Sequence, residues 1–240
     1  MRIVVVNPNT TASMTARIER SARAVAGPGT RVDAVTSTMG PASIESHYDE
    51  ALSVPGVLAA VRAGGADGYV IACFGDPGLD AAREVAAAPV VGIAEAAMHA
   101  AALLGRGFSV VTTLDRTRGR AWDLAGRYVA PGACRGVHAC DIPVLDLDGD
   151  PAVTDRVVAL ARAALARDGS DVVVLGCAGM ADLAAEVSRR VGVPVVDGVA
   201  AATLLVQSLV TLGLGTSKHG ELAPPPPKPY TGALTPFGTA

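Results

Sequence analysis

The 240-residue sequence has few aromatic residues, since phenylalanine, tryptophan and tyrosine together make up only 3% of it. Half of the residues are hydrophobic, so the core must be built from alanine, valine, leucine and isoleucine. Charged residues make up only 18%, and the net charge is −3. The sequence contains no run of basic residues interleaved with aromatic ones. This composition excludes a disordered or fibrous protein and argues against nucleic acid as a partner.

Cysteine is also scarce, because four cysteines in 240 residues do not make a disulfide scaffold. No secretory leader is visible, since the first apolar run, 3–6, ends at Asn7. The longest apolar stretch, 193–214, is interrupted by Asp197 and Gln207, which favours a buried helix over a membrane span. We therefore expect a cytoplasmic protein that does not contact a membrane and whose thiols stay reduced.

Val-rich runs alternate along the chain with Ala-rich stretches, which is typical of a parallel sheet covered by helices. A first series of runs predicts strands at 2–6, 30–36, 67–72 and 89–93, and helices at 12–26, 45–64, 77–87 and 94–104. A second series predicts strands at 107–112, 135–140, 171–176 and 193–197, and helices at 116–128, 152–168, 179–190 and 198–213.

The second series repeats the first at an almost constant offset. The residue numbers give offsets of 105 for Val6 and Val111, 104 for Cys73 and Cys177, and 105 for Pro89 and Pro194. We therefore expect an α/β fold of two pseudo-symmetric domains, each a mainly parallel sheet flanked by helices, with the active site in the cleft between them. The expected domains are 1–97 and 98–204, and the C-terminal helix and tail, 205–240, join the first.

Cys73 and Cys177 occupy matching positions, each directly after a predicted strand and before a predicted helix. Open parallel sheets bind ligands beyond the carboxyl ends of their strands, and the positive end of a following helix favours a thiolate. A lone cysteine is more often simply buried in a core, but the matched placement of two favours a function. One thiolate can remove a proton from one face of a carbon while the other thiol delivers a proton to the opposite face.

Small residues and hydroxyl or amide groups surround the two thiols. Small residues let backbone N–H groups approach a bound oxygen closely, and side-chain donors at the strand ends can hold an enolate oxygen as charge develops. The substrate-binding residues that we expect are Asn7, Thr11, Phe74, Gly75, Thr112, Thr113, Ala178 and Gly179. Asn7 taken alone is equally well interpreted as part of a turn and helix cap.

Five segments carry a resemblance to a known family. They are 7–11 (NPNTT), 72–78 (ACFGDPG), 92–96 (GIAEA), 110–113 (VVTT) and 176–180 (GCAGM). Together they resemble the hydantoin and allantoin racemases of the aspartate/glutamate racemase superfamily, and the similarity extends from residue 2 to about residue 213. The resemblance implies two α/β domains, a cofactor-independent racemisation at C5 of a hydantoin ring, and a homo-oligomer. It also implies that Cys73 and Cys177 are the two acid/base residues.

The residues after each cysteine distinguish between members of this superfamily. Racemases of free acidic amino acids typically have Asn-Thr after the first cysteine and Thr-His or Thr-Glu after the second. Here Phe74-Gly75 and Ala178-Gly179 stand there, so the site has fewer hydroxyls for a carboxylate and suits a neutral ring better. We expect Phe74 and the loop 44–48 to select the ring substituent. An aspartate/glutamate-type racemase and a non-catalytic protein that clamps a small ligand between two domains stay open as alternatives.

Signals for a metal or cofactor are weak. Neither cysteine-bearing segment contains the lysine that pyridoxal phosphate would require, and no dinucleotide-binding glycine pattern occurs. Cys134, His138 and Cys140 have spacing that could suit zinc, but no fourth ligand accompanies them. A calcium loop is also disfavoured, because the spacing of Asp141, Asp146, Asp148 and Asp150 departs from that of an EF-hand. We expect no cofactor and no metal, with Glu95 supporting the cleft and His47 in a lid or at a solvated helix start.

Overall fold

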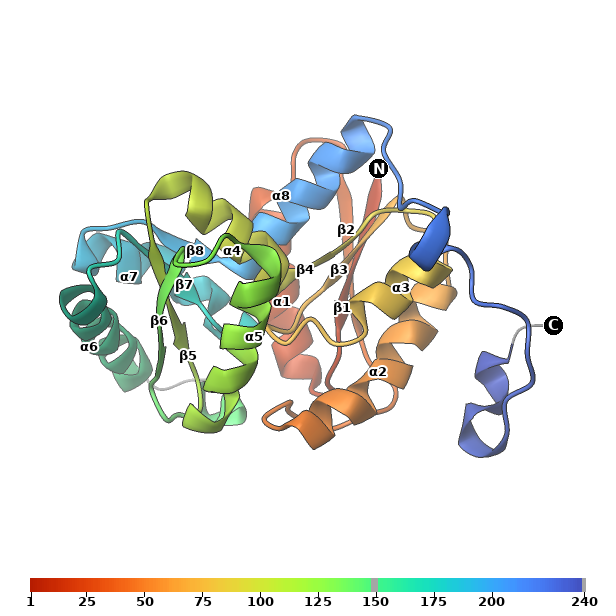
Figure 1. The fold of residues 1–240 in the computed structure, drawn as a ribbon, viewed down its shortest axis with the longest axis horizontal. Coiled ribbons are helices and arrows are strands. Elements are labelled where there is room, and N and C mark those ends of the chain that lie inside the picture. The colour runs from red at the N-terminus through yellow and green to blue at the C-terminus, as the bar shows by residue number, and fades with distance from the viewer. Residues whose placement is uncertain (148–150, 239–240) are drawn as a thin grey trace.

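The computed structural model describes residues 1–147 and 151–238 as two parallel sheets side by side (Figure 1). The first sheet has the strand order β2-β1-β3-β4, with β1 (Arg2–Asn7), β2 (Arg31–Thr36), β3 (Gly68–Ile71) and β4 (Val90–Gly92). Its helices are α1 (Ala12–Val25), α2 (His47–Arg62), α3 (Leu79–Val85) and α4 (Ile93–Leu104). The prediction of an α/β fold with a mainly parallel sheet is confirmed for this half.

The second sheet repeats the order of the first as β6-β5-β7-β8, with β5 (Phe108–Thr112), β6 (Cys134–Ala139), β7 (Val172–Leu175) and β8 (Val195–Asp197). Its helices are α5 (Arg118–Tyr128), α6 (Pro151–Asp168), α7 (Ala184–Val191) and α8 (Gly198–Thr211). Val6 pairs with Ile71 in the first sheet, and Val111 pairs with Leu175 in the second. The repeat in the sequence therefore corresponds to a repeat in strand order and register.

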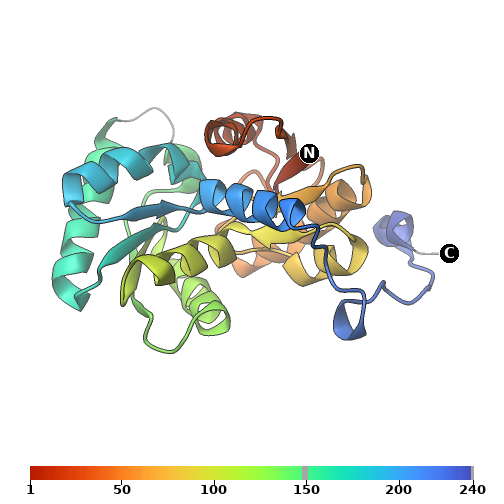
Figure 2. The same ribbon diagram turned by 90° about the horizontal axis from the view of Figure 1, so that it is seen from above.

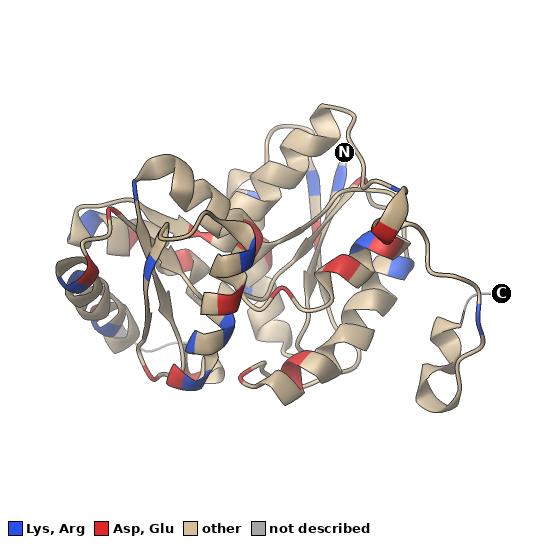
Figure 3. Ribbon diagram, viewed as in Figure 1, with Lys and Arg blue, Asp and Glu red and all other residues tan. Residues whose placement is uncertain are grey.

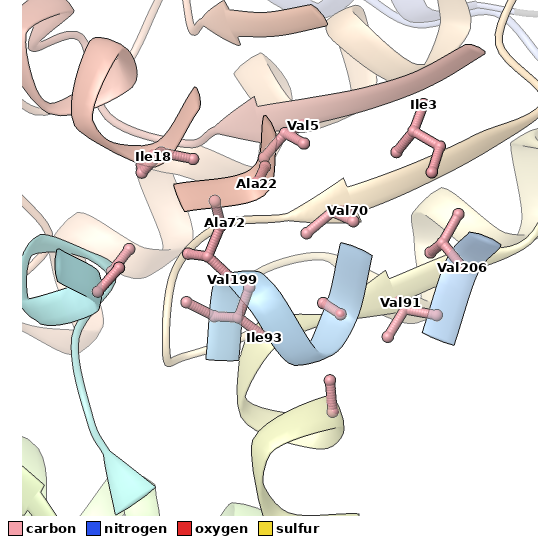
Figure 4. Packing of buried hydrophobic residues seen from close by; sticks show 14 of the residues in the cluster. Ile3, Val5, Ile18, Ala22, Val70, Ala72, Val91, Ile93, Val199 and Val206 are labelled. Carbon is pink, nitrogen blue, oxygen red and sulfur yellow. The ribbon is translucent and has the colours of Figure 1, made fainter. Parts of the chain in front are cut away.

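Aliphatic side chains fill the core of the first sheet, as the composition predicts. Ile3, Val5 and Val70 are completely buried there, and Val199 and Val206 of α8 pack against them (Figure 4). Burying aliphatic surface of this kind stabilises a fold by about 25 cal/mol for each Å² removed from water. The sheet is hydrophobic because helices cover it, which is the usual reason for continuous Val-rich strands.

Helices α4 and α8 each follow the last strand of one sheet and pack on the other sheet. Met98 and Ala101 of α4 lie in the core around Phe108 and Val110 of the second half. Helix α8 follows β8 and packs into the core of the first half, and the two helices contact each other between the sheets (Figure 2). This exchange of helices holds the two sheets in one arrangement.

The expected domain boundary after residue 97 falls inside α4, whose residues Ile93–Leu104 form one continuous helix. The division into 1–97 with 205–240 and 98–204 stays a prediction. Helix α8 does pack on the first sheet, but it begins already at Gly198.

Two expected helices begin later than the sequence predicts. Helix α3 starts at Leu79 rather than at residue 77, because residues 73–78 form a tight turn in which Asp76 and Gly78 have φ of +46° and +68°. The expected helix 179–190 is a 3₁₀ segment, Ala178–Leu183, followed by α7. Both differences lie directly after a candidate catalytic cysteine.

Beyond α8 the chain first runs along α3, where the N–H of Thr216 donates to the carbonyl of Ala87 at 2.9 Å, and its last part then extends away from both sheets (Figure 1). The guanidinium of Arg62 lies 5.7 Å from the centre of the Phe237 ring and connects this tail to α2. Basic and acidic residues are interspersed over both halves (Figure 3). No helix within residues 1–147 or 151–238 combines the length and apolar character needed to cross a membrane.

Candidate active site

Cys73 and Cys177 line one cavity of about 190 Å³ between the two halves of the protein. Each follows the carboxyl end of a central strand, Cys73 after β3 and Cys177 after β7. The cavity is smaller than the roughly 300–1,000 Å³ of pockets for drug-sized ligands, so it suits a small molecule. The geometry that the sequence predicts, with one thiol from each half on a shared space, is therefore present.

Each thiol receives a hydrogen bond from the backbone two residues further along the chain. The N–H of Gly179 donates to Sγ of Cys177 at 3.4 Å, and the N–H of Gly75 lowers the pKa of Cys73 in the same way. A donor placed there stabilises a thiolate when one forms. The two halves thus repeat not only the thiol but also its backbone donor.

The two thiols hold their protons more tightly than the sequence suggests. Burial raises the pKa of Cys73 to about 12 and that of Cys177 to about 11, against the opposing effect of the backbone N–H groups. The expectation that a following helix lowers these values is wrong. After Cys73 the helix begins only at Leu79, and after Cys177 the chain forms a short 3₁₀ segment, so desolvation dominates.

Five of the eight expected binding residues line the cavity with the thiols. They are Phe74, Gly75, Thr112, Thr113 and Ala178. Thr112 is buried, and its hydroxyl donates to the carbonyl of Gly176 at 3.2 Å, so this side chain is held in place.

Asn7, Thr11 and Gly179 do not line the cavity. Asn7 is completely buried, and its amide donates to Oδ1 of Asn9 at 2.8 Å and to Oγ1 of Thr15 at 2.9 Å. The Thr11 hydroxyl donates to the carbonyl of Ala42 at 2.8 Å. Asn7 therefore braces the turn after β1, and Asn9 is the residue of this turn that reaches the cavity.

The cavity also contains a charged pair that the sequence did not single out. Oε1 of Glu50 on α2 lies 2.7 Å from Nη2 of Arg120 on α5, and both residues line the cavity. Nη2 of Arg120 also donates to the carbonyl of Gly75 at 2.7 Å. His47 begins α2 and lines the same cavity, so it lies at the site rather than at a purely solvated helix start.

Comparison with known proteins shows which family the chain belongs to. The profile of the Asp/Glu/hydantoin racemase family matches residues 3–206. The chain belongs to this family.

Individual relatives cover the chain almost completely. The hydantoin racemase of Rhizobium meliloti is 48% identical over 229 residues, which cover 94% of this chain and 95% of the relative. The hydantoin racemase of Pseudomonas sp. (strain NS671) is 44% identical over 242 residues, covering 99% and 97%. The solved structure of the allantoin racemase from Klebsiella pneumoniae is 51% identical, covers 99% of both chains and has a TM-score of 0.96. The resemblance found in the sequence is confirmed.

The weaker metal signals do not form a site in this racemase-family chain. The Cys134 thiol is directed to the carbonyl of Gly136, and the Cys140 thiol to the carbonyl of Thr113. His138 instead bonds Asp168 at 2.9 Å. Residues 1–147 and 151–238 contain no group of three or more His, Cys, Asp or Glu side chains that could hold a metal ion. Asp148 and Asp150 of the calcium hypothesis lie outside the described residues.

Glu95 of the racemase-family chain also lies away from the cavity lining. Its carboxylate pairs with Arg83 at 2.6 Å, and its backbone N–H donates to Asp76 at 2.9 Å. Its contacts support the start of α4, the helix that joins the two halves.

Proposed function

We propose that the protein is a cofactor-independent isomerase that racemises hydantoins substituted at C5, including allantoin. The observation that carries the proposal is the shared cavity with Cys73 on one side and Cys177 on the other. Membership of the racemase family and the similarity to hydantoin and allantoin racemases support the same activity.

In the proposed reaction, the thiolate of one cysteine removes the proton from C5 of the ring. The electron pair of the broken C–H bond moves into the adjacent carbonyl and forms an enolate. The thiol of the other cysteine then gives its proton to C5 from the opposite face. Each turnover therefore leaves the enzyme with thiol and thiolate exchanged, and no electron donor or acceptor is needed.

The remaining residues of the cavity have roles that follow from their chemistry. Thr112 and Thr113 line the cavity as candidate donors to the enolate oxygen, where preorganised hydrogen bonds lower the barrier most. The small residues Gly75 and Ala178 keep the backbone close to the ring, and Phe74 forms an apolar part of the wall. Asn9 takes the cavity position that we expected Asn7 to occupy.

The experiment follows each enantiomer of a hydantoin in deuterated water by optical rotation and by loss of the C5–H signal in NMR spectra. The wild-type protein should lose optical activity and incorporate deuterium together. Cys73→Ala and Cys177→Ala should each lower racemisation by at least about 1,000-fold, because no second acid remains. Each variant should still exchange C5–H on one enantiomer only, and the two variants should prefer opposite enantiomers.

Cys134→Ala is the matched control, because Cys134 is buried in the core of the second half, outside the cavity. It should retain racemisation. Full activity in either cavity variant would exclude the two-thiol mechanism. Racemisation of aspartate or glutamate would favour the amino-acid alternative, and ligand binding without exchange would favour a binding protein. The cytoplasmic location that the composition suggests and the homo-oligomer that the family resemblance implies remain predictions.

A further inference from the structure

A charged pair with one residue from each half lines the cavity. Glu50 lies in the first turn of α2, Arg120 lies in the first turn of α5, and their side chains are only partly exposed, at 19% and 32%. Oε1 of Glu50 accepts from Nη2 of Arg120 at 2.7 Å. A partly desolvated pair is costly to place in a binding cavity unless a ligand uses its remaining hydrogen-bonding capacity.

Arg120 retains an unused donor within this pair. Its Nη2 atom donates both to the carboxylate of Glu50 and to the carbonyl of Gly75. Its Nε atom is buried and has no hydrogen-bond partner anywhere in the part of the chain that the structure describes. A buried N–H without an acceptor requires an explanation. Nε has no contact with solvent in this structure, so an acceptor on the substrate pairs with it when the guanidinium, which lines the cavity, turns toward the ligand.

Glu50 brings a hydrogen-bond acceptor close to the reacting centre. A Cβ atom added to Gly75 would lie 3.4 Å from Oε2 of Glu50 and 3.9 Å from Sγ of Cys73. The carboxylate and the thiol therefore border the same small space. A group attached to the carbon on which Cys73 acts is within reach of Glu50 and Arg120.

We infer that Glu50 and Arg120 bind a urea group on C5 of the substrate ring, so that allantoin is preferred over hydantoins with aliphatic or aromatic substituents. The urea carbonyl accepts from Nε–H of Arg120, and the urea N–H groups donate to the carboxylate of Glu50. An isopropyl or benzyl group displaces water from the pair but satisfies neither residue. This inference rests on the proposed racemase function and names the substrate class of that site.

The first test compares allantoin with 5-isopropylhydantoin on the wild-type protein. Each kcat/KM is divided by the rate of uncatalysed C5–H exchange of the same compound at the same pH, which removes the difference in intrinsic acidity. We expect the corrected ratio to favour allantoin by about 100-fold or more, because polar groups of a site discriminate against ligands that leave them unpaired. A ratio near one, or one that favours 5-isopropylhydantoin, would overturn the inference.

The second test changes the pair. Glu50→Gln removes the charged acceptor, and Arg120→Lys keeps the positive charge but removes the Nε–H donor. Each should lower kcat/KM for allantoin about 10- to 100-fold, which is the usual effect of losing a hydrogen bond to a charged group. The loss on 5-isopropylhydantoin should be at least tenfold smaller. Equal losses on both substrates would show that the pair holds the ring or the fold, and would overturn the inference.

The pair Glu186–Arg189 on α7 supplies matched controls, because Glu186→Gln and Arg189→Lys change the same residue types at an exposed surface. They should leave both rates unchanged. Thermal melting establishes that each cavity variant is folded, and the wild-type ratio decides the question if one is not. Failure to racemise either compound would refute the proposed function. Racemisation of both without preference would refute only the assignment of the urea site.

Discussion

Oδ1 of Asp76 accepts a hydrogen bond from the backbone N–H of Ala94 at 3.0 Å, so the loop that carries Cys73 is fastened to the first turn of α4. Oδ2 accepts from the N–H of Glu95 at 2.9 Å. Burial raises the pKa of Asp76 to about 7, although these N–H groups and the Tyr128 hydroxyl oppose the rise. The carboxylate thus connects the candidate catalytic loop with the helix that crosses into the second half.

In the second half, the corresponding helix α8 is capped by a different residue. Asp197, at the end of β8, caps α8 by accepting from the N–H groups of Val199 and Ala200, both at 3.0 Å. The matching residue at the end of β4 is Gly92, and its helix receives the carboxylate of Asp76 instead. Asp76 therefore both caps a helix and belongs to a cysteine loop, whereas the cap bonds of Asp197 stay at the start of its own helix.

This difference predicts distinct effects of two similar substitutions. Asp76→Asn and Asp197→Asn should each reduce the free energy of unfolding by about 1–3 kcal/mol, because the amide presents an N–H group where an acceptor is needed. Only Asp76→Asn should also lower kcat, by about 10- to 100-fold with little change in KM, because it shifts Cys73. Urea unfolding and steady-state rates check both. Equal effects on kcat would contradict a positioning role for Asp76.

Gly92, at the end of β4, leaves the space that the Asp76 carboxylate occupies. A Cβ atom there would lie 2.2 Å from Cγ of Asp76, so Gly92→Ala must displace the carboxylate. We expect a loss of about 1–3 kcal/mol in unfolding free energy, as for other overpacked sites. The loss should be smaller in an Asp76→Gly background, where no carboxylate stands in the way and glycine suits the φ of +46°. A double-mutant cycle measures this coupling, and purely additive effects would rule out the contact.

The repeated pattern of strands could be predicted because it is encoded locally. Runs such as 2–6 and 107–112 are apolar along their whole length, and the constant offset aligns Cys73 with Cys177 without any knowledge of tertiary contacts. The same reasoning assigned Asn7 to the cavity and was wrong about its direction. Asn7 faces Thr15 of α1, and a strand end does not reveal which face its last side chain takes.

The charged pair and the helix cap could not be predicted from local pattern. Glu50 and Arg120 lie 70 positions apart, and each separately resembles an ordinary charged residue in the first turn of a helix. Asp76 follows a glycine in a turn, where aspartate is common for local reasons. Their partners depend on how α2, α5 and α4 pack, which periodicity does not specify.

The second half also contains a polar cluster that should respond to acid. Although burial opposes it, hydrogen bonds from Ser109, Ser170 and His138 lower the pKa of Asp168. A lowered pKa means that the unfolded chain binds the proton more readily, so this stabilisation is present above about pH 4 and is lost as the pH falls through the folded value. The cluster therefore ties the stability of the second sheet to ionised Asp168.

Ser109→Ala removes the hydroxyl that donates to Asp168 at 2.6 Å. The pKa of Asp168 should move back toward its ordinary value, so unfolding free energy should depend less steeply on pH below about pH 4. Urea unfolding at a series of acidic pH values measures that slope. Ser208→Ala is the control. Ser208 is exposed on α8, and its hydroxyl donates to the carbonyl of Leu204 within the same helix. Parallel curves for wild type and Ser109→Ala would contradict the prediction.

The raised pKa values of the two cavity thiols predict slow alkylation at neutral pH. The pKa is about 12 for Cys73 and about 11 for Cys177. At pH 7, Cys177 is therefore a thiolate in only about one protein molecule in 10,000. Because the thiolate is the nucleophile, the rate of reaction with iodoacetamide should rise about tenfold for each pH unit from about 7 to 10. The logarithm of kcat/KM should rise with a slope near one over the same range, since racemisation needs one thiolate.

Mass spectrometry of each alkylated cysteine, with the Cys73→Ala/Cys177→Ala variant giving the background from Cys134 and Cys140, separates the sites. A rate that is already constant above pH 7 would show that backbone N–H groups at Gly75 and Gly179 outweigh burial, and that the thiols are ionised before substrate arrives.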